Sequence, residues 1–186
     1  YTHHFALLLI PKDLEYIREK SMEFFWDLMQ VKYLIIGPEL SKVLANFTDH
    51  ESYKHLASYP ALGSNLYEIT KNKPYSSYAF LPLGKNQTYE EMLQQLNSPD
   101  IDVLQSHYDK LVFPDDPQQD FMVLNAKRGS ANRYYEIESK QEALLIEFES
   151  WNHNWEGIVN NKSKTVEKVF HILKGIHLTP CLNQIN

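Results

Sequence analysis

The apolar pattern of the first thirty residues predicts a strand that leads directly into a long helix. Residues 5–10 form an unbroken apolar run, which is too short to cross a membrane and has the length of a buried strand. After Pro11, apolar side chains between residues 14 and 29 recur at steps of three and four, and this spacing places Phe25 and Leu28 on one face of a helix. We expect the rest of the chain to pack around this strand and helix.

Further helices are predicted where apolar helical spacing follows the Ser/Thr-x-x-Glu pattern of a capping box, which occurs three times. In a capping box, the Ser or Thr side chain and the Glu side chain each accept a backbone hydrogen bond at the start of a helix. A proline in the first turn and a glycine at the end mark two more helices. In chain order, the expected helices cover about residues 48–58, 88–96, 98–111, 139–158 and 165–173.

Short apolar segments between turn residues predict strands. Residues 66–70 and 78–83 are expected to form a hairpin with a long polar turn. Residues 121–126 and 133–138 are expected to form two strands across a turn that contains Gly129. The run 31–36 is either the end of the first helix or a short strand, because its length fits both.

These elements predict a single compact α+β domain over residues 1–186. The sheet is expected to be small, mixed or antiparallel, and packed against several helices, with more helix than strand. One core suits a chain of 186 residues, 43% of which are hydrophobic. Because residue 1 is Tyr rather than Met, the chain can be an excised piece of a longer protein.

Charge and composition narrow the function classes. A formal net charge of −6 gives no basic footprint, so we expect no nucleic-acid partner. No apolar run approaches the roughly 20 residues of a membrane-spanning helix, so we expect no span within this chain. A Walker loop, a dinucleotide fingerprint and zinc-spaced cysteines are all missing, so we expect no cofactor and no metal. Cys181, the only cysteine, is typical of a reducing compartment such as the cytoplasm, but secreted or periplasmic domains also occur without disulfides, so the localisation stays open.

The segment from Lys127 to Arg133 is the most distinctive candidate for binding. It places Arg128 and Arg133, two of the chain's three arginines, at one strand-to-strand turn. Guanidinium groups bind planar anions bidentately, so this turn can hold the phosphate or carboxylate of a small anionic ligand. The alternative is a solvated hairpin tip, and such tips also contact partner proteins.

Trp151 and Trp155 form a second candidate, with only Asn-His-Asn between them. If this segment is helical, the two indoles lie one turn apart on the helix. An exposed pair would offer a platform for a sugar or a peptide, whereas a buried pair is part of the core. We favour the core interpretation and keep both residues as binding candidates.

A catalytic alternative comes from the tripeptide His177-Leu-Thr179. Its H-x-T pattern resembles the motif of the two-histidine phosphoesterases, in which two such motifs on strands supply an acid and a base while the hydroxyls hold the phosphate. The other H-x-[ST] tripeptide runs from His50 to Ser52, inside an expected helix. The resemblance covers a short segment at each end of the chain. It implies a hydrolase that uses His177 and Thr179 with a second histidine, either His50 together with Ser52 or His4, because paired acid–base catalysis needs two such groups.

The leading functional hypothesis is a non-catalytic module that binds a protein or a small ligand. Binding would use exposed Tyr and Trp side chains or the hairpin of Arg128 and Arg133. We find no group of residues with the spacing of a known reaction class, but catalytic sites often assemble from residues distant in sequence. The sequence therefore leaves open whether the protein is an enzyme, and a phosphodiesterase-like hydrolase is the alternative.

Overall fold

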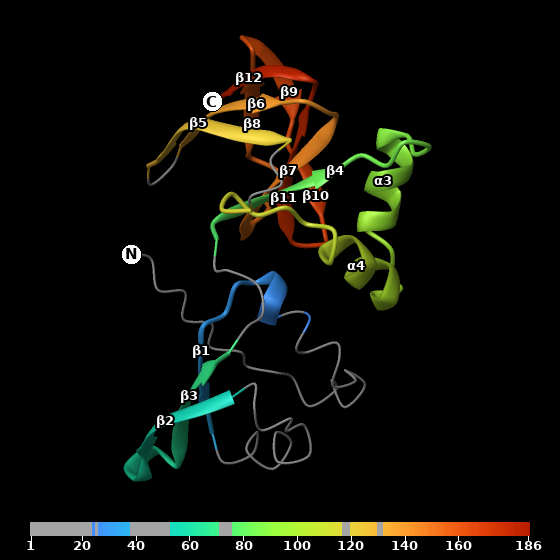
Figure 1. Cartoon of the computed structure of the whole chain (residues 1–186). Coiled ribbons are helices and arrows are strands. Elements are labelled where there is room, and N and C mark those ends of the chain that lie inside the picture. The colour runs from blue at the N-terminus through green and yellow to red at the C-terminus, as the bar shows by residue number, and fades with distance from the viewer. Residues whose placement is uncertain (1–23, 25, 38–52, 71–75, 117–119, 130–131) are drawn as a thin grey trace. The chain divides into compact units, whose positions relative to one another are not determined.

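The computed structural model of the chain describes residues 24, 26–37, 53–70, 76–116, 120–129 and 132–186. They belong to two compact units, Tyr1–Tyr75 and Ser76–Asn186, which we call the N-terminal and the C-terminal unit (Figure 1). The described residues form twelve strands in three antiparallel sheets, and their helices are short. The expected α+β fold with more helix than strand is therefore wrong. The single domain expected over residues 1–186 stays a prediction.

The described part of the N-terminal unit is built around a three-stranded sheet. Its strands are β1 (Tyr33–Ile36), β2 (Tyr53–Tyr59) and β3 (Ser64–Ile69), in the order β1-β3-β2. A short 3-10 helix and Gly63 join β2 to β3, and Gly63 adopts a left-handed φ of 59° that costs a glycine little. Trp26, from the helical turn before β1, packs with Leu34 and Ile69 in a small core.

The C-terminal unit contains two antiparallel sheets and two α-helices. Its helices are α3 (Tyr89–Leu96) and α4 (Ile101–Tyr108). In chain order, its strands are β4 (Tyr78–Pro82), β5 (Phe121–Arg128), β6 (Arg133–Ser139), β7 (Ala143–Ser150), β8 (Glu156–Val159), β9 (Lys162–Thr165), β10 (Glu167–Val169), β11 (Leu173–Leu178) and β12 (Cys181–Ile185). A four-stranded sheet has the order β10-β11-β7-β4, and a five-stranded sheet has the order β5-β6-β12-β8-β9.

The main core of the C-terminal unit lies between these two sheets. Leu145 of β7 and Ile176 of β11 belong to one buried cluster with Ile137 of β6 and Ile185 of β12. Because side chains alternate along a strand, every second residue of these strands points into this space. This alternation decides which polar residues enter the interior.

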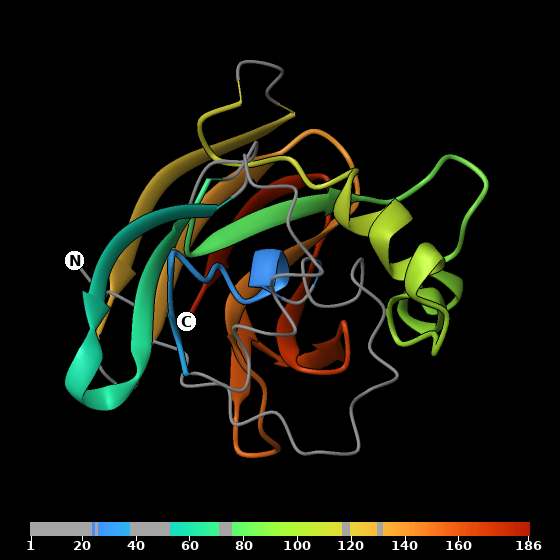
Figure 2. The ribbon, with the colours of Figure 1, turned by 90° about the horizontal axis from the view of Figure 1, so that it is seen from below.

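Both helices lie beside the four-stranded sheet, on the same side of the unit in two perpendicular views (Figures 1 and 2). The backbone N–H of Phe170 donates to the carbonyl of Leu96 over 2.8 Å, which ties the end of α3 to the turn after β10. The capping box predicted for α3 is confirmed, because Thr88 Oγ1 accepts from the N–H of Glu91 and Glu91 Oε2 accepts from the N–H of Thr88.

The helix expected over residues 139–158 is wrong, because this segment forms β7, a turn and β8. β7 is buried on both faces: Leu144 and Ile146 point away from Leu145, yet all three side chains are 0% exposed. A strand covered on both faces has a nearly continuous apolar sequence. Such a run also satisfies helical spacing, so periodicity could not separate the two structures.

Three other expectations are also wrong. The expected helix over residues 165–173 is instead the end of β9, the whole of β10 and the start of β11. Residues 53–58, expected to be helical, lie in β2. The expected hairpin between residues 66–70 and 78–83 does not form, because β3 pairs with β1 and β2 whereas β4 pairs with β7.

The local predictions are confirmed. Strands β5 and β6 form the expected hairpin around Gly129. The segment 98–111 contains α4, and the run 31–36 contains β1. Leu28 is fully buried, as expected. None of the helices in the described ranges has the length and apolar character to cross a membrane. The expected strand at 5–10, most of the first helix including Phe25, and the helix start at Thr48 lie outside the described residues.

Candidate functional site

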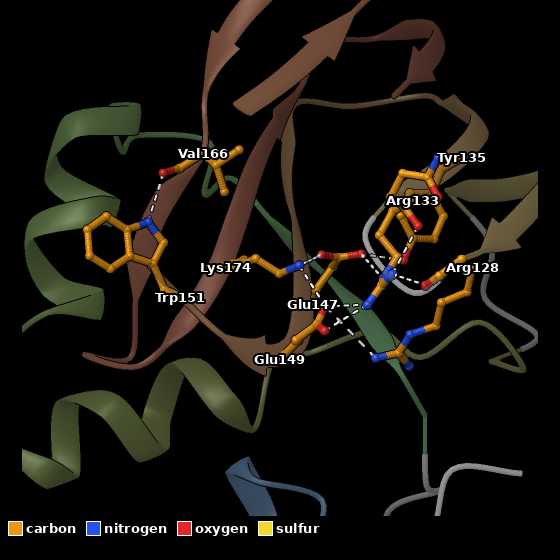
Figure 3. Close-up of polar contacts among 10 residues, drawn as sticks. Arg128, Arg133, Tyr135, Glu147, Glu149, Trp151, Val166 and Lys174 are labelled. Carbon is orange, nitrogen blue, oxygen red and sulfur yellow. Dashed lines mark hydrogen bonds and ion pairs between the residues drawn. The ribbon is translucent and has the colours of Figure 1, made fainter. Parts of the chain in front are cut away.

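A group of charged side chains lies inside the C-terminal unit, between its two sheets (Figure 3). Lys174 of β11 stands directly opposite Glu147 of β7, and both point to the same side as the core residues Ile176 and Leu145. Lys174 is 1% exposed and Glu147 is 4% exposed. Because such side chains are almost never fully buried unless they are paired, their partners determine the chemistry of the site.

The ammonium group of Lys174 is held by two carboxylates and one aromatic ring. Its Nζ lies 2.5 Å from Glu147 Oε2 and 2.7 Å from Glu149 Oε2. It also lies 3.6 Å from the centre of the Trp155 ring, within the range of a cation–π interaction. The ammonium group is therefore enclosed by two negative charges and one aromatic face.

Arg133, the first residue of β6, supplies the second buried cation. Its Nη2 donates to both carboxylate oxygens of Glu149, over 2.7 and 2.8 Å. Its Nη1 donates to the carbonyls of Asn132 and Gly129, which fixes the guanidinium group against the β5–β6 turn. We refer to Arg133, Glu147, Glu149 and Lys174 as the charged cluster.

Tyr135 completes the hydrogen bonding of Glu147, because its hydroxyl donates to Glu147 Oε1 over 2.5 Å. Burial raises the pKa of Tyr135 far above its usual value, and the adjacent carboxylate raises it further, so this hydroxyl stays protonated and remains a donor. Burial also raises the pKa of Glu149, but the Lys174 and Arg133 cations outweigh burial and hold that pKa below its usual value.

A cavity of about 260 Å³ adjoins the charged cluster. Arg133, Glu147 and Lys174 form the buried part of its polar side, and Val166, Ile176 and Ile185 form much of its apolar side. The rest of the polar lining is exposed and consists of Asn132, Asn154, Glu156 and Asn186. The indole of Trp155 also lines it. The cavity therefore combines a charged wall with an apolar wall, as small-molecule sites commonly do.

Two N–H groups on residues that line this cavity lack an acceptor within the described residues. They are Nε1 of Trp155 and Nε of Arg133, and both atoms are buried. Arg133 Nε lies 3.9 Å from Glu147 Oε1, which is too long for a hydrogen bond. Buried polar groups in proteins are almost always hydrogen-bonded, so two open donors beside one cavity indicate that something else supplies the acceptor.

The structure separates the three basic residues proposed for the β5–β6 hairpin. Lys127 and Arg128 are exposed near the turn, and Arg128 Nη2 is 3.9 Å from Glu149 Oε2. Arg133 instead turns inward, and its side chain is only 9% exposed. The fork of Arg133 that was expected to bind an anion is already bound to Glu149, so a ligand anion would have to displace this carboxylate.

Trp151 and Trp155 lie in the turn between β7 and β8, not on a helix. Both pack against the core between the sheets. Trp151 donates its indole N–H to the carbonyl of Val166 over 3.0 Å, whereas the indole N–H of Trp155 stays open. The two residues therefore differ in function: Trp151 anchors the turn, and Trp155 borders the cavity.

Of the catalytic alternative, the structure describes His177 and Thr179 but not His4, and neither of these two described residues lines the cavity. His177 lies on β11 but alternates with Ile176 and Leu178, so it points to the opposite face of the sheet from Lys174. There its Nε2 is 2.7 Å from Glu142 Oε1, and its ring stacks on Tyr89 with centroids 4.1 Å apart.

Thr179 lies beyond the end of β11, and its Oγ1 is 3.2 Å from Cys181 Sγ. His50 and Ser52 lie outside the described residues. The paired-histidine hydrolase therefore stays a prediction. Within the described ranges, no group of three or more His, Cys, Asp or Glu side chains is placed to hold a metal ion.

Sequence reasoning missed Glu147, Glu149 and Lys174 because it assigned their segments to helices. A signal was nevertheless present. Glu147 interrupts an apolar run on β7, and Lys174 interrupts a largely apolar run on β11. A single charge inside a buried strand needs an opposite charge nearby, so two such strands are candidates for pairing.

Comparison with models of protein families, with curated proteins and with solved structures found no match. The function must therefore be argued from the site itself.

Proposed function

We propose that the C-terminal unit is a non-catalytic binding domain that takes a small molecule into the cavity beside Trp155. The observation that carries this proposal is the pair of buried N–H groups, on Arg133 and Trp155, that have no acceptor within the described residues. An unpaired buried donor costs about 1–3 kcal/mol, so a ligand that supplies acceptors would stabilise the unit.

The size of the cavity supports a ligand of modest dimensions. Its volume of about 260 Å³ lies just below the usual range for ligand pockets, about 300–1,000 Å³. A cavity of about 150 Å³ is already large enough to bind benzene. Ordered water is the alternative occupant, because a cavity with polar walls can hold several hydrogen-bonded molecules.

The buried ionisable groups at the cavity favour binding over reaction. Glu147 accepts from Tyr135 and contacts Lys174, and Lys174 is shared with Glu149. A general base or a nucleophile needs a free lone pair within reach of the substrate. Here the carboxylates and the ammonium group are already bound to one another, which supports a structural role for them as one wall of the site.

The proposal can be tested by screening a library of small fragments against the protein with ligand-observed NMR. Ile176→Trp would fill part of the cavity, because Ile176 lines it and is 6% exposed. Ile158→Trp is the matched control: the same substitution on β8, at a side chain that is 45% exposed. Thermal denaturation of each variant first shows that it is folded.

We expect fragments that bind the wild-type protein to bind the Ile158→Trp variant equally and to lose binding in the Ile176→Trp variant. Fragments that bind all three proteins alike would place the binding site elsewhere and refute the proposal. If no fragment binds the wild-type protein, the cavity holds only water, and the proposal is equally refuted.

The β5–β6 hairpin supports a second candidate function, contact with a protein partner. The exposed Lys127 and Arg128 place positive charge near its tip. A pull-down with wild-type protein and with Lys127→Glu/Arg128→Glu tests it, since this variant leaves Arg133 in the charged cluster. Loss of a captured partner would support the hairpin as the contact surface, and an unchanged set of partners would rule it out.

A further inference from the structure

We infer that the ligand of this cavity is an uncharged molecule with an apolar body and at least one acceptor oxygen, such as an amide or another small carbonyl compound. This inference rests on the proposed binding function and adds the chemical class of the ligand. It follows from three features of the cavity: the balance of its charges, the two open donors and the apolar wall.

The charges of the buried cluster beside the cavity cancel without a ligand, and Glu156, the other charged side chain that lines the cavity, is exposed to water, which screens its charge. Arg133 and Lys174 carry two positive charges, and Glu147 and Glu149 carry two negative charges at distances of 2.5–2.8 Å from them. An anionic ligand would compete with the glutamates for the same cations, and a cationic ligand would compete with the cations for the same carboxylates. A charge brought into this site without a partner is strongly disfavoured, so the ligand is neutral.

The two N–H groups without an acceptor determine which hydrogen-bonding groups the ligand must supply. Trp155 Nε1 and Arg133 Nε are donors only, because neither an indole nor a guanidinium nitrogen accepts a hydrogen bond. The ligand therefore supplies acceptors. A carbonyl oxygen has two lone pairs and can satisfy one donor or both.

The rest of the ligand contacts hydrocarbon. Val166, Ile176 and Ile185 are at most 7% exposed and line the cavity with hydrocarbon. Scaling from the six carbons of benzene in about 150 Å³, the cavity of about 260 Å³ holds roughly ten non-hydrogen atoms. A phenyl or branched alkyl group next to an amide has this size.

Four probes of nearly equal size test the chemical class directly: 2-phenylacetamide, phenylacetate, 2-phenylethylammonium and propylbenzene. The chain has three Trp residues and thus three indole N–H signals in a ¹H–¹⁵N NMR spectrum. The Trp155→Phe variant identifies the Trp155 signal by its disappearance. The three polar probes are titrated into the 186-residue chain to about 10 mM, because ligands of ten atoms bind with Kd values of the order of 1 mM. Propylbenzene is titrated only to its much lower solubility in water, and its shifts are compared with those of the amide at the same concentration.

We expect 2-phenylacetamide to shift the Trp155 indole signal with saturation, and both charged probes to bind at least about tenfold more weakly. The Trp155→Phe variant should bind the amide about tenfold more weakly, because it loses one donor. Trp26→Phe is the matched control, since Trp26 packs in the core of the N-terminal unit and does not line the cavity, so its loss should leave the affinity for the amide unchanged.

The outcomes separate this inference from the proposed function. If phenylacetate or the ammonium probe binds most tightly, the neutral class is wrong while binding in the cavity stands. If propylbenzene binds as tightly as the amide and Trp155→Phe leaves the affinity for the amide unchanged, the ligand does not need an acceptor oxygen, while binding in the cavity again stands. If no probe perturbs any signal and the fragment screen is also negative, both the chemical class and the proposed function are refuted.

Discussion

Replacement of Lys174 by Met gives the sharpest test of the charged cluster. Met keeps most of the hydrocarbon of the Lys side chain, so the main change is the loss of one charge. Lys174 Nζ lies 2.5 Å from a carboxylate of Glu147 and 2.7 Å from one of Glu149. At an effective dielectric constant of about 20, each contact corresponds to an attraction of about 6 kcal/mol.

That attraction is not the stability that the ion pairs contribute, because burying each ion costs several kcal/mol. Removing only the cation has a larger effect than this net contribution. The carboxylates stay buried and desolvated, but they lose the attraction to Lys174 that offset the cost of burying them. Glu147 would be left 4% exposed with the Tyr135 hydroxyl as its hydrogen-bonding partner. We therefore expect Lys174→Met to lower the free energy of unfolding by about 3–5 kcal/mol.

The measurement is a urea titration followed by the indole NMR signals of Trp151 and Trp155, which report on the C-terminal unit alone. Lys174→Met/Glu147→Gln should recover at least about 2 kcal/mol, because the unpaired charge is removed while Gln still accepts from Tyr135. Lys164→Met, at an exposed position of β9, is the matched control and should change stability by less than about 0.5 kcal/mol. A cost below about 1 kcal/mol for Lys174→Met, or a double variant no more stable than the single one, would refute the reasoning.

Two further predictions follow from the same unit. The pKa of Glu149 is held below its unfolded value, so its ionised form stabilises the folded state above about pH 4.5, and this contribution is lost as the pH falls through the folded pKa. The stability difference between wild type and Glu149→Gln, measured by urea unfolding, should therefore shrink between about pH 6 and pH 3; a constant difference would contradict the assigned cause. Gly175→Ala should lower the free energy of unfolding by about 1–3 kcal/mol, because the added Cβ would lie 3.0 Å from side-chain carbons of both Leu144 and Val169. Thermal denaturation measures this effect, and an unchanged midpoint would show that the two neighbours can move apart.

The parts of the fold that the sequence predicted correctly are those determined by neighbouring residues. Helix α3 begins at a capping box whose two hydrogen bonds join Thr88 and Glu91, three residues apart. The β5–β6 hairpin closes through a bond between the N–H of Gly129 and the carbonyl of Asn132. In both cases the signal and the structure lie within a few residues of each other, so no knowledge of the rest of the chain was needed.

The C-terminal strands could not be predicted in this way, because their structure depends on what covers them. β7 is buried on one face by the core between the sheets and is also fully buried at Leu144 and Ile146 on the other face. Its apolar run therefore carries neither the alternation of a half-exposed strand nor a polar helix face. The Ser139–Glu142 spacing then favoured a helix, although Glu142 contacts His177 of the neighbouring β11 instead.

The buried charges also specify how the strands pair. In the observed register, Lys174 lies opposite Glu147, and its ammonium group reaches Glu149 on the same face of β7. A slip of β11 by one residue would turn Lys174 to the other face, among Leu144 and Ile146, and would leave both carboxylates without this cation. Two apolar side chains at positions 147 and 174 would stabilise the core about equally in the observed register and in the shifted one. The charged side chains are paired only in the observed register, so they disfavour the shifted one. The charged wall of the cavity and the register of β7 and β11 therefore depend on the same contacts of Lys174. A substitution that changes the register should also change the shape of the cavity.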